Sequence, residues 1–204
     1  MTHTGLLLDF GGVVTTDFYG ALRAFCLRER LPENAIETAL ATPAGHEALA
    51  AVESGVLPQR DYEQTLARML GLDADGLLAR ALADLRPRTE VYTLVDRARA
   101  AGITVGVLSN SWGTGAFDPY AGYGLEERFD AVVISDQVGM RKPDPAIYRL
   151  AADQIGVQTG DCVFVDDTPR NLPPASELGM VTVLFPDTRS GVDEIERLLG
   201  LHDQ

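Results

Sequence analysis

The chain has 204 residues, of which 17 are Lys or Arg and 30 are Asp or Glu, which gives a formal net charge of −13 at pH 7. A negative surface repels polyphosphate backbones, so this composition argues against a nucleic-acid partner. No apolar run approaches the roughly 20 residues needed to cross a bilayer, and residues 1–4 lack the basic and apolar regions of a signal peptide, so we expect a cytoplasmic protein without a membrane segment.

Residues 17–85 have helical periodicity throughout. In the first stretch, Leu22, Phe25, Cys26 and Leu27 recur near a period of 3.6 residues, and Pro32 is of a type that favours the first turn of a helix. Glycine and proline residues separate the later stretches. The expected helices cover 19–30, a segment that starts at 32, 45–52, 59–70 and 74–85.

The rest of the chain alternates between short apolar runs and amphipathic stretches. Strands are expected at 5–8, 103–108, 131–134, 162–165 and 181–185, and helices at 89–101, 144–155, 172–178 and 192–199. This alternation is typical of βαβ units and a parallel sheet with helices on both faces. The sequence therefore predicts an α/β core formed by residues 1–16 and 86–204, with an all-helical insertion at 17–85.

Acidic, hydroxyl and amine side chains stand where the predicted strands end. The first strand ends at Asp9 and leads into Gly11 and Gly12, which let the backbone come close to a ligand. In a parallel sheet the carboxyl ends of the strands share one edge, and ligands bind there. The residues expected to meet at this edge are Asp9, Ser109, Asn110, Lys142, Asp166 and Asp167. Two adjacent acids at a buried strand end are costly without a cation, which favours a metal site.

These motifs, in this order, resemble those of the haloacid dehalogenase-like hydrolase superfamily. Asp9 matches its nucleophile motif, Ser109 its hydroxyl motif, Lys142 its lysine motif, and Asp166 with Asp167 its acidic motif. Segments 141–145 and 177–182 are most similar to the phosphatase branch that contains the N-terminal domains of soluble epoxide hydrolases and small bacterial sugar-phosphate phosphatases. The resemblance implies a Rossmann-like core, with segment 17–85 as a helical cap.

The resemblance also implies a reaction and a set of ligands. Asp9 would attack the phosphorus of a small phosphorylated metabolite and form an aspartyl-phosphate intermediate. Mg²⁺ would be bound by Asp9, Asp167 and the backbone carbonyl of Gly11, since hard oxygen ligands suit this ion. Lys142, held by Asp166, would neutralise negative charge. Ser109 and the backbone amides around Asn110 would bind the phosphoryl oxygens.

Gly11 departs from the family pattern, which has a second aspartate at this position. That aspartate protonates the leaving alcohol and then activates water, and such a group commonly contributes about 10²–10⁴ in rate. Thr15, Thr16 or Asp17 could replace it if the loop folds back. We therefore expect a phosphatase of uncertain strength. A metal-free 2-haloacid dehalogenase and a non-catalytic ligand-binding relative remain as alternatives, although the paired acids favour a metal.

Other reactive residue types have simpler explanations. The two cysteines, Cys26 and Cys162, are expected to be reduced and buried, and the three histidines, His3, His46 and His202, match no ligand spacing. Trp112 and Gly113 could line the pocket or pack in a loop. Arg60, Arg68 and Arg80 are expected on solvated helix faces.

Overall fold

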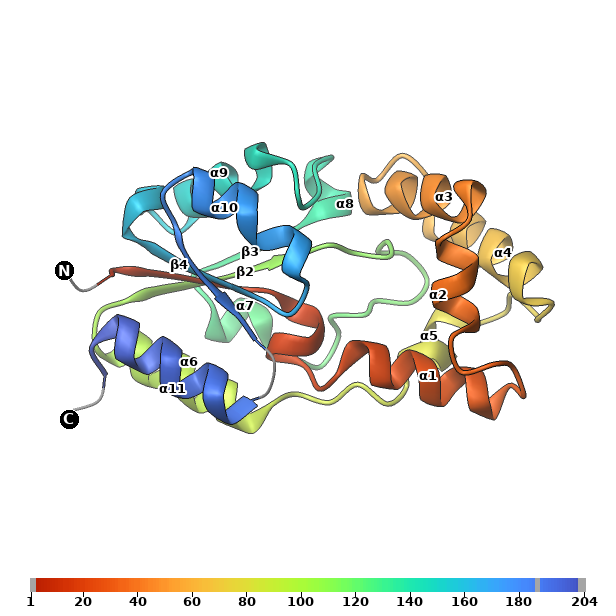
Figure 1. The fold of residues 1–204 in the computed structure, drawn as a ribbon, viewed down its shortest axis with the longest axis horizontal. Coiled ribbons are helices and arrows are strands. Elements are labelled where there is room, and N and C mark those ends of the chain that lie inside the picture. Colours follow the sequence, from red (N-terminus) through yellow and green to blue (C-terminus); the bar gives the residue numbers. More distant parts are fainter. Residues whose placement is uncertain (1–2, 186–187, 202–204) are drawn as a thin grey trace.

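Five parallel strands form a single sheet in the order β3-β2-β1-β4-β5 in the computed structural model, which describes residues 3–185 and 188–201 (Figure 1). The strands are β1 Gly5–Leu8, β2 Thr104–Ser109, β3 Ala131–Ile134, β4 Cys162–Asp166 and β5 Val181–Leu184. Every neighbouring pair is parallel. All five strands predicted from the apolar runs are confirmed, and their ends differ from the prediction by at most one residue.

Helices cover both faces of this sheet, because successive side chains of a strand point to opposite faces. On β1, Leu6 and Leu8 belong to the cluster formed with α6 (Thr89–Ala100) and α11 (Thr188–Leu199). Leu7 belongs instead to the cluster formed with α9 (Pro145–Gln154) and α10 (Leu172–Glu177). The run of apolar residues in β1 is therefore buried on both sides, as expected for a central parallel strand.

Five helices lie between β1 and α6 in the sequence and form what we call the helical insertion. They are α1 Phe18–Arg28, α2 Ala35–Leu40, α3 Pro43–Glu53, α4 Gln59–Leu70 and α5 Leu77–Ala81. These helices bury an apolar cluster of their own, and Figure 1 shows them beyond the carboxyl ends of the strands. That they act as a separate cap, with boundaries at 17 and 85, stays a prediction.

Several helix boundaries differ from the predicted ones. Pro32 does not start a helix: the Ala35 N–H donates to its carbonyl in a turn, and α2 begins only at Ala35. Helix α5 is shorter than the predicted 74–85, because Gly76 adopts a positive φ of 59° directly before it. Leu27 is exposed although the neighbouring periodic residues are buried. Two short helices, α7 (Leu125–Arg128) and α8 (Ser135–Val138), carry too little periodic signal to be predicted.

A loop that follows β2 connects the core to the helical insertion. Trp112 in this loop is buried in the apolar cluster of the insertion, with its ring centroid 5.8 Å from that of Tyr62 on α4. The buried Gln59 side chain donates to the carbonyls of Gly113 (2.6 Å) and Phe117 (2.8 Å). Apolar packing and hydrogen bonds thus anchor this loop inside the insertion.

The cysteines and histidines behave largely as predicted. Cys26 and Cys162 are buried free thiols, and His46 is exposed. His3 is half-buried, with Nδ1 3.3 Å from the Leu198 carbonyl, whereas His202 lies outside the described residues.

The prediction for the arginines is correct for two of the three. Arg60 and Arg68 are exposed on α4. Arg80 is more constrained than predicted, because its Nε pairs with Glu29 at 3.1 Å and its guanidinium donates to backbone carbonyls. Within residues 3–185 and 188–201, no helix is long and apolar enough to cross a membrane.

Candidate active site

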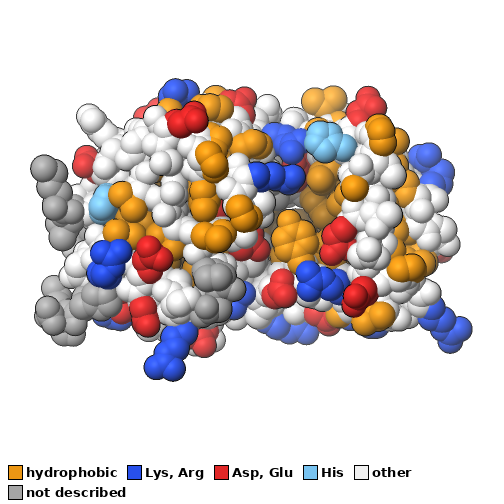
Figure 2. Space-filling view, in the orientation of Figure 1, with side chains coloured by type: hydrophobic (Ala, Val, Ile, Leu, Met, Phe, Trp, Pro, Cys, Tyr) orange, Lys and Arg blue, Asp and Glu red, His pale blue; other side chains and the backbone are white. Residues whose placement is uncertain are grey.

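A cavity of about 120 Å³ lies between the carboxyl edge of the sheet and the helical insertion, and Figure 2 shows the surface hollowed at this junction. Residues from both parts line it. Those from the core are Asp9, Gly11, Asn110, Trp112, Lys142, Asp167, Thr168, Arg170 and Asn171. Those from the insertion are Phe18, Tyr19, Leu22, Ile36, Glu37, Leu40, Leu49 and Glu53. The cavity therefore contains most of the residues that the sequence places at the strand ends.

The turn after β1 sets the position of Asp9. Residues 10–14 form one wide helical turn, inside which Gly12 has a positive φ of 82°. A Cβ on Gly12 would lie 2.0 Å from Oδ2 of Asp167, so only glycine fits here. Arg88 donates to the carbonyls of Gly12 (3.2 Å) and Thr15 (2.7 Å) and so ties this turn to the start of α6. This contact joins the two segments of the chain that flank the insertion.

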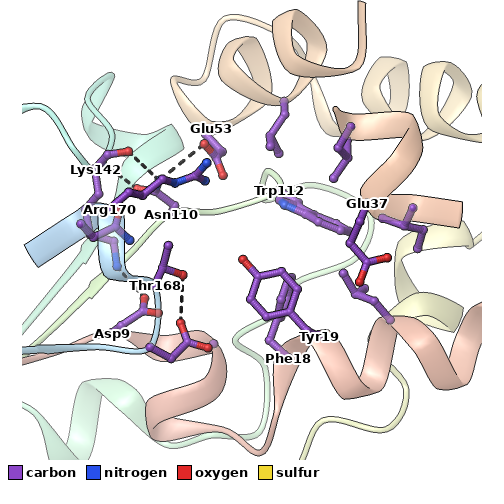
Figure 3. A pocket seen from close by; sticks show the side chains of 17 residues that line it. Asp9, Phe18, Tyr19, Glu37, Glu53, Asn110, Trp112, Lys142, Thr168 and Arg170 are labelled. Carbon is purple, nitrogen blue, oxygen red and sulfur yellow. Dashed lines mark hydrogen bonds and ion pairs between the residues drawn. The ribbon is translucent and has the colours of Figure 1, made fainter. Parts of the chain in front are cut away.

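Lys142 connects the first and last acidic motifs. Its buried ammonium donates to Oδ1 of Asp9 and Oδ2 of Asp166, each at 2.7 Å. The Asn110 side chain holds the Lys142 backbone from both sides: Oδ1 accepts from the Lys142 N–H (2.8 Å), and Nδ2 donates to its carbonyl (3.0 Å). The predicted pairing of Lys142 with Asp166 is therefore present. Figure 3 shows the Asn110 side chain against the Lys142 backbone, a positioning contact that sequence alone does not reveal.

The two adjacent acids have different surroundings. Asp166 is fully buried and accepts hydrogen bonds from Lys142, the Thr168 N–H (2.8 Å) and the Asn171 amide (3.0 Å to each oxygen). Asp167 is half-buried, lines the cavity and accepts from the Thr168 hydroxyl (3.1 Å). Asp166 thus has its oxygens occupied by protein donors, whereas Asp167 keeps an oxygen free for a ligand.

The carboxylates outnumber the cation that pairs with them. Asp9, Asp166 and Asp167 have ligand oxygens within 4.8 Å of one another. Burial, with repulsion from Asp166 and Asp167, raises the pKa of Asp9 to about 8 even though Lys142 opposes the shift. Burial and the charge of Asp166 likewise raise the pKa of Asp167 to about 6. Burial alone would lower the pKa of Lys142, but the two flanking carboxylates raise it, so this ammonium stays charged.

This donor set fits a hard divalent cation. Mg²⁺ prefers oxygen ligands and commonly uses one or two carboxylates together with water and phosphate oxygens. Asp9 and Asp167 supply two cavity-facing carboxylates. Their pKa values are raised by burial first and by repulsion between the carboxylates second, and a bound cation would offset both effects.

Two further predicted site residues, Gly11 and Asn110, line the cavity. Ser109 lies behind the lining, with its buried hydroxyl 2.9 Å from that of Tyr120, so binding a phosphoryl oxygen would require it to leave this partner.

None of the three candidate stand-ins for the absent aspartate lines the cavity. The Thr15 hydroxyl is buried and accepts from the Gly12 N–H. The Thr16 hydroxyl accepts from the Arg86 N–H, and the Asp17 carboxylate caps α1 through the Gly20 N–H. Each of these groups is thus already engaged in holding the ends of the insertion.

Sequence reasoning misses several residues that face the site. Glu53, the last residue of α3, is buried and forms a 2.9 Å ion pair with Arg141 across the junction between insertion and core. Its burial raises its pKa to about 7, although Arg141 and the exposed Arg170 oppose the shift. Helical periodicity does not reveal Glu53, because its burial depends on contact with the core. Arg170 and Thr168 could have been suspected, since they follow the acidic motif directly.

Comparison with known proteins gives a family match over most of the chain. A family model described as haloacid dehalogenase-like hydrolase matches residues 4–179. The rat (Rattus norvegicus) bifunctional epoxide hydrolase 2 is 43% identical over 76 residues, which are 37% of this chain and 14% of that enzyme. A glyceraldehyde 3-phosphate phosphatase of Methanopyrus kandleri is 29% identical over 128 residues, 58% of this chain and 55% of that protein. The chain thus spans only part of the length of these relatives.

Solved structures support the fold. An enzyme from Bacteroides thetaiotaomicron, crystallised with magnesium and inorganic phosphate, superposes with a TM-score of 0.65 at 21% identity over 89% of this chain and 93% of that one. A dehalogenase superposes with a TM-score of 0.69 at 19% identity over 97% of both chains. The α/β fold is therefore shared by an enzyme crystallised with magnesium and phosphate and by a dehalogenase, so the reaction has to be argued from the residues of the site.

Proposed function

The chain belongs to the haloacid dehalogenase-like hydrolase family, and from this membership we propose that it is a Mg²⁺-dependent phosphatase of small phosphorylated metabolites. The observation that carries the proposal is the cluster at the carboxyl edge of the sheet. Asp9 faces a cavity, is paired with Lys142 at 2.7 Å, and has the oxygens of Asp166 and Asp167 within 4.8 Å. Asp166 holds Lys142 with or without a metal, but a metal-free reaction at Asp9 would leave the cavity-lining Asp167 carboxylate without a role.

In the proposed reaction Asp9 acts as the nucleophile. Its carboxylate oxygen bonds to phosphorus while the ester P–O bond breaks, and the leaving oxygen keeps the electron pair. Water then attacks the aspartyl phosphate, which releases inorganic phosphate and restores the carboxylate. Lys142 keeps the carboxylate oriented and places a positive charge beside the atoms that gain negative charge. Asp166 holds Lys142 and is a positioning residue in this scheme.

Mg²⁺ would be held by Asp9, Asp167 and the backbone carbonyl of Gly11, and when bound it would neutralise the carboxylates and the phosphoryl oxygens. Asn110 would orient the phosphoryl group through its backbone and through the Lys142 loop that its side chain holds. Ser109 would assist after exchanging its Tyr120 partner for a phosphoryl oxygen.

The missing acid at position 11 limits this chemistry. No side chain of residue 11 can protonate the leaving oxygen, and Thr15, Thr16 and Asp17 are engaged elsewhere. The proposed enzyme should therefore be slow on esters whose alcohols leave poorly. The scheme requires neither a membrane nor a nucleic acid, and we place it in the cytoplasm.

Trapping of the nucleophile tests the proposal. Beryllium fluoride with Mg²⁺ should form an acyl-phosphate mimic on Asp9, visible by fluorine NMR in the wild type and absent in Asp9→Asn. Release of chloride from 2-chloropropionate in metal-free buffer, without such an adduct, would identify a dehalogenase instead. Binding of Mg²⁺ and phosphate without hydrolysis of any phosphate ester would identify a non-catalytic relative.

A further inference from the structure

The cavity has two chemically different ends. Figure 3 shows Asp9, Lys142 and Thr168 on one side and Trp112 and Phe18 on the other. The second end is walled by six apolar side chains: Phe18, Leu22, Ile36, Leu40, Leu49 and Trp112. A sugar offers hydroxyl groups on every side and would leave most of them without partners against such a wall.

The polar groups at the apolar end can satisfy only a few such hydroxyl groups. Glu37 is the charged residue of the insertion that lies there. One of its oxygens lies 3.8 Å from Arg23, whereas Oε2 is buried without a hydrogen bond among the described residues and can accept one from a substrate hydroxyl. A carboxylate repels a second anionic group on the substrate, so a bisphosphate or phosphorylated acid fits poorly. The walls therefore suit a neutral, largely apolar body with few hydroxyl groups, attached to a single phosphate.

The aromatic side chains at the apolar end favour a ring as the substrate body. Phe18 and Trp112 pack edge to face there, with their ring centroids 5.4 Å apart, and Tyr19 also lines the cavity. Aromatic groups gain from edge-to-face contacts with such walls.

The residue at position 11 gives an independent indication. Gly11 cannot protonate a leaving group, and an alkanol leaves as an anion about as basic as hydroxide, since water has a pKa of about 15.7. A phenol ionises near pH 10, as the tyrosine side chain does, and leaves without a proton donor. The apolar and aromatic lining of the cavity and the chemistry of position 11 thus favour the same kind of ester.

We propose that the substrates are phosphate monoesters of small aromatic hydroxyl compounds, with the ring against Trp112 and Phe18 and the phosphoryl group at Asp9. This inference rests on the proposed phosphatase function. It differs from the sugar-phosphate substrates suggested by the family resemblance.

Three esters separate the contribution of the apolar body to binding from the contribution of the leaving group to the rate of hydrolysis. Phenyl phosphate has an apolar body and a good leaving group, cyclohexyl phosphate an apolar body and a poor one, and glycerol 3-phosphate a polar body and a poor one. Cyclohexyl phosphate should have a KM close to that of phenyl phosphate but a kcat lower by about 10² or more. Glycerol 3-phosphate should have a low kcat and also a KM about tenfold higher.

Two variants of the insertion test whether the apolar end of the cavity binds the ester body. Leu40 is half-buried and lines the cavity, whereas Leu27 is exposed on α1 and does not. Leu40→Asn should raise KM for phenyl phosphate about tenfold and leave inhibition by inorganic phosphate within twofold of the wild type, because free phosphate needs only the polar end. Leu27→Asn should change neither value.

Each failure has its own signature. Hydrolysis of glycerol 3-phosphate with a kcat/KM equal to or above that of phenyl phosphate would overturn the inference and leave the phosphatase function standing. An unchanged KM in Leu40→Asn would do the same. A fluoroberyllate adduct without hydrolysis of phenyl phosphate would also overturn the inference. Neither adduct nor hydrolysis would overturn the phosphatase function, and the inference with it.

Discussion

Substitution of either glycine after Asp9 by alanine should have opposite consequences, although the two residues are neighbours. Gly12 has a φ of +82°, and its added Cβ would lie 2.0 Å from Oδ2 of Asp167. Gly11 has a φ of −71°, which alanine adopts freely, and its Cβ would come no closer than 3.2 Å to another described group, the Phe18 ring. Gly11→Ala is therefore a matched control for Gly12→Ala.

The expected magnitudes follow from these distances. Ordinary contact begins at 3.4 Å, so the Asp167 carboxylate must move by more than 1 Å to admit alanine at position 12. Misplacement of a reacting group by about 1 Å can cost about 10²-fold in rate. The positive φ adds about 1–2 kcal/mol of backbone strain for alanine, which lowers Tm by about 2–8 °C in a chain of this size. Gly11→Ala should stay within about 1 kcal/mol of the wild type.

Titration calorimetry with Mg²⁺, phosphatase assays on phenyl phosphate and thermal unfolding should be run on both variants. Gly12→Ala should weaken Mg²⁺ binding at least tenfold and lower kcat about 10²-fold. Gly11→Ala should retain wild-type Mg²⁺ affinity, because it keeps its backbone carbonyl. Wild-type Mg²⁺ affinity in folded Gly12→Ala, or an equal loss in Gly11→Ala, would refute the assigned contact between this turn and Asp167.

Three further predictions concern the same site. Asp167→Asn should abolish measurable Mg²⁺ binding and chelator-sensitive phosphatase activity; full activity of the wild type in chelator would show that no metal is needed. Gly11→Asp should raise the rate on cyclohexyl phosphate at least tenfold, about 1.4 kcal/mol off the barrier, and little on phenyl phosphate; equal changes on both esters would mean that position 11 does not lack a proton donor. The folded-state pKa of Glu53, about 7, exceeds its usual 4.5, so the folded state binds an extra proton whose stabilisation is complete below pH 4.5 and is lost as the pH rises through 7. Urea unfolding at pH 4.5 and 8 should show that the fall in unfolding free energy between these pH values is about 3 kcal/mol smaller in Glu53→Gln than in the wild type. An equal fall in both proteins would show that folding does not raise the pKa of Glu53.

The strands, and the grouping of reactive side chains at their ends, were predictable because a parallel sheet buries its strands and brings their carboxyl ends to one edge. An apolar run that ends in a polar residue marks a buried strand, and the carboxyl ends of such strands meet at one edge. The sequence therefore brought Asp9, Lys142, Asp166 and Asp167 together without any tertiary information, and the structure places them in one cluster. Boundaries within the insertion were less predictable, since the turn at Pro32 depends on a local hydrogen bond that composition does not specify.

Residues that reach the site from the insertion could not be predicted. Glu53 ends α3, and Leu40 ends α2; nothing in the sequence of these helices indicates that their last residues face a cavity shared with the core. The partner of Ser109 is equally hidden, because Tyr120 lies in an irregular loop and meets Ser109 only when that loop folds back. Helical periodicity indicates which face of a helix is buried, but it does not say what that face meets.

The anchoring of Trp112 bears on the kinetics of substrate entry. A motion that separates the helical insertion from the sheet while the loop stays with the sheet withdraws this side chain from its apolar cluster. An aromatic side chain buries about 150–250 Å², so its withdrawal costs about 4–6 kcal/mol at 25 cal/mol per Å². A state this high in free energy is populated about once in 10³–10⁴ molecules, and a ligand that required it would lose apparent affinity by the same factor. Entry past Tyr19 and Arg170, both exposed at the rim of the cavity, needs no such withdrawal and would be the faster route.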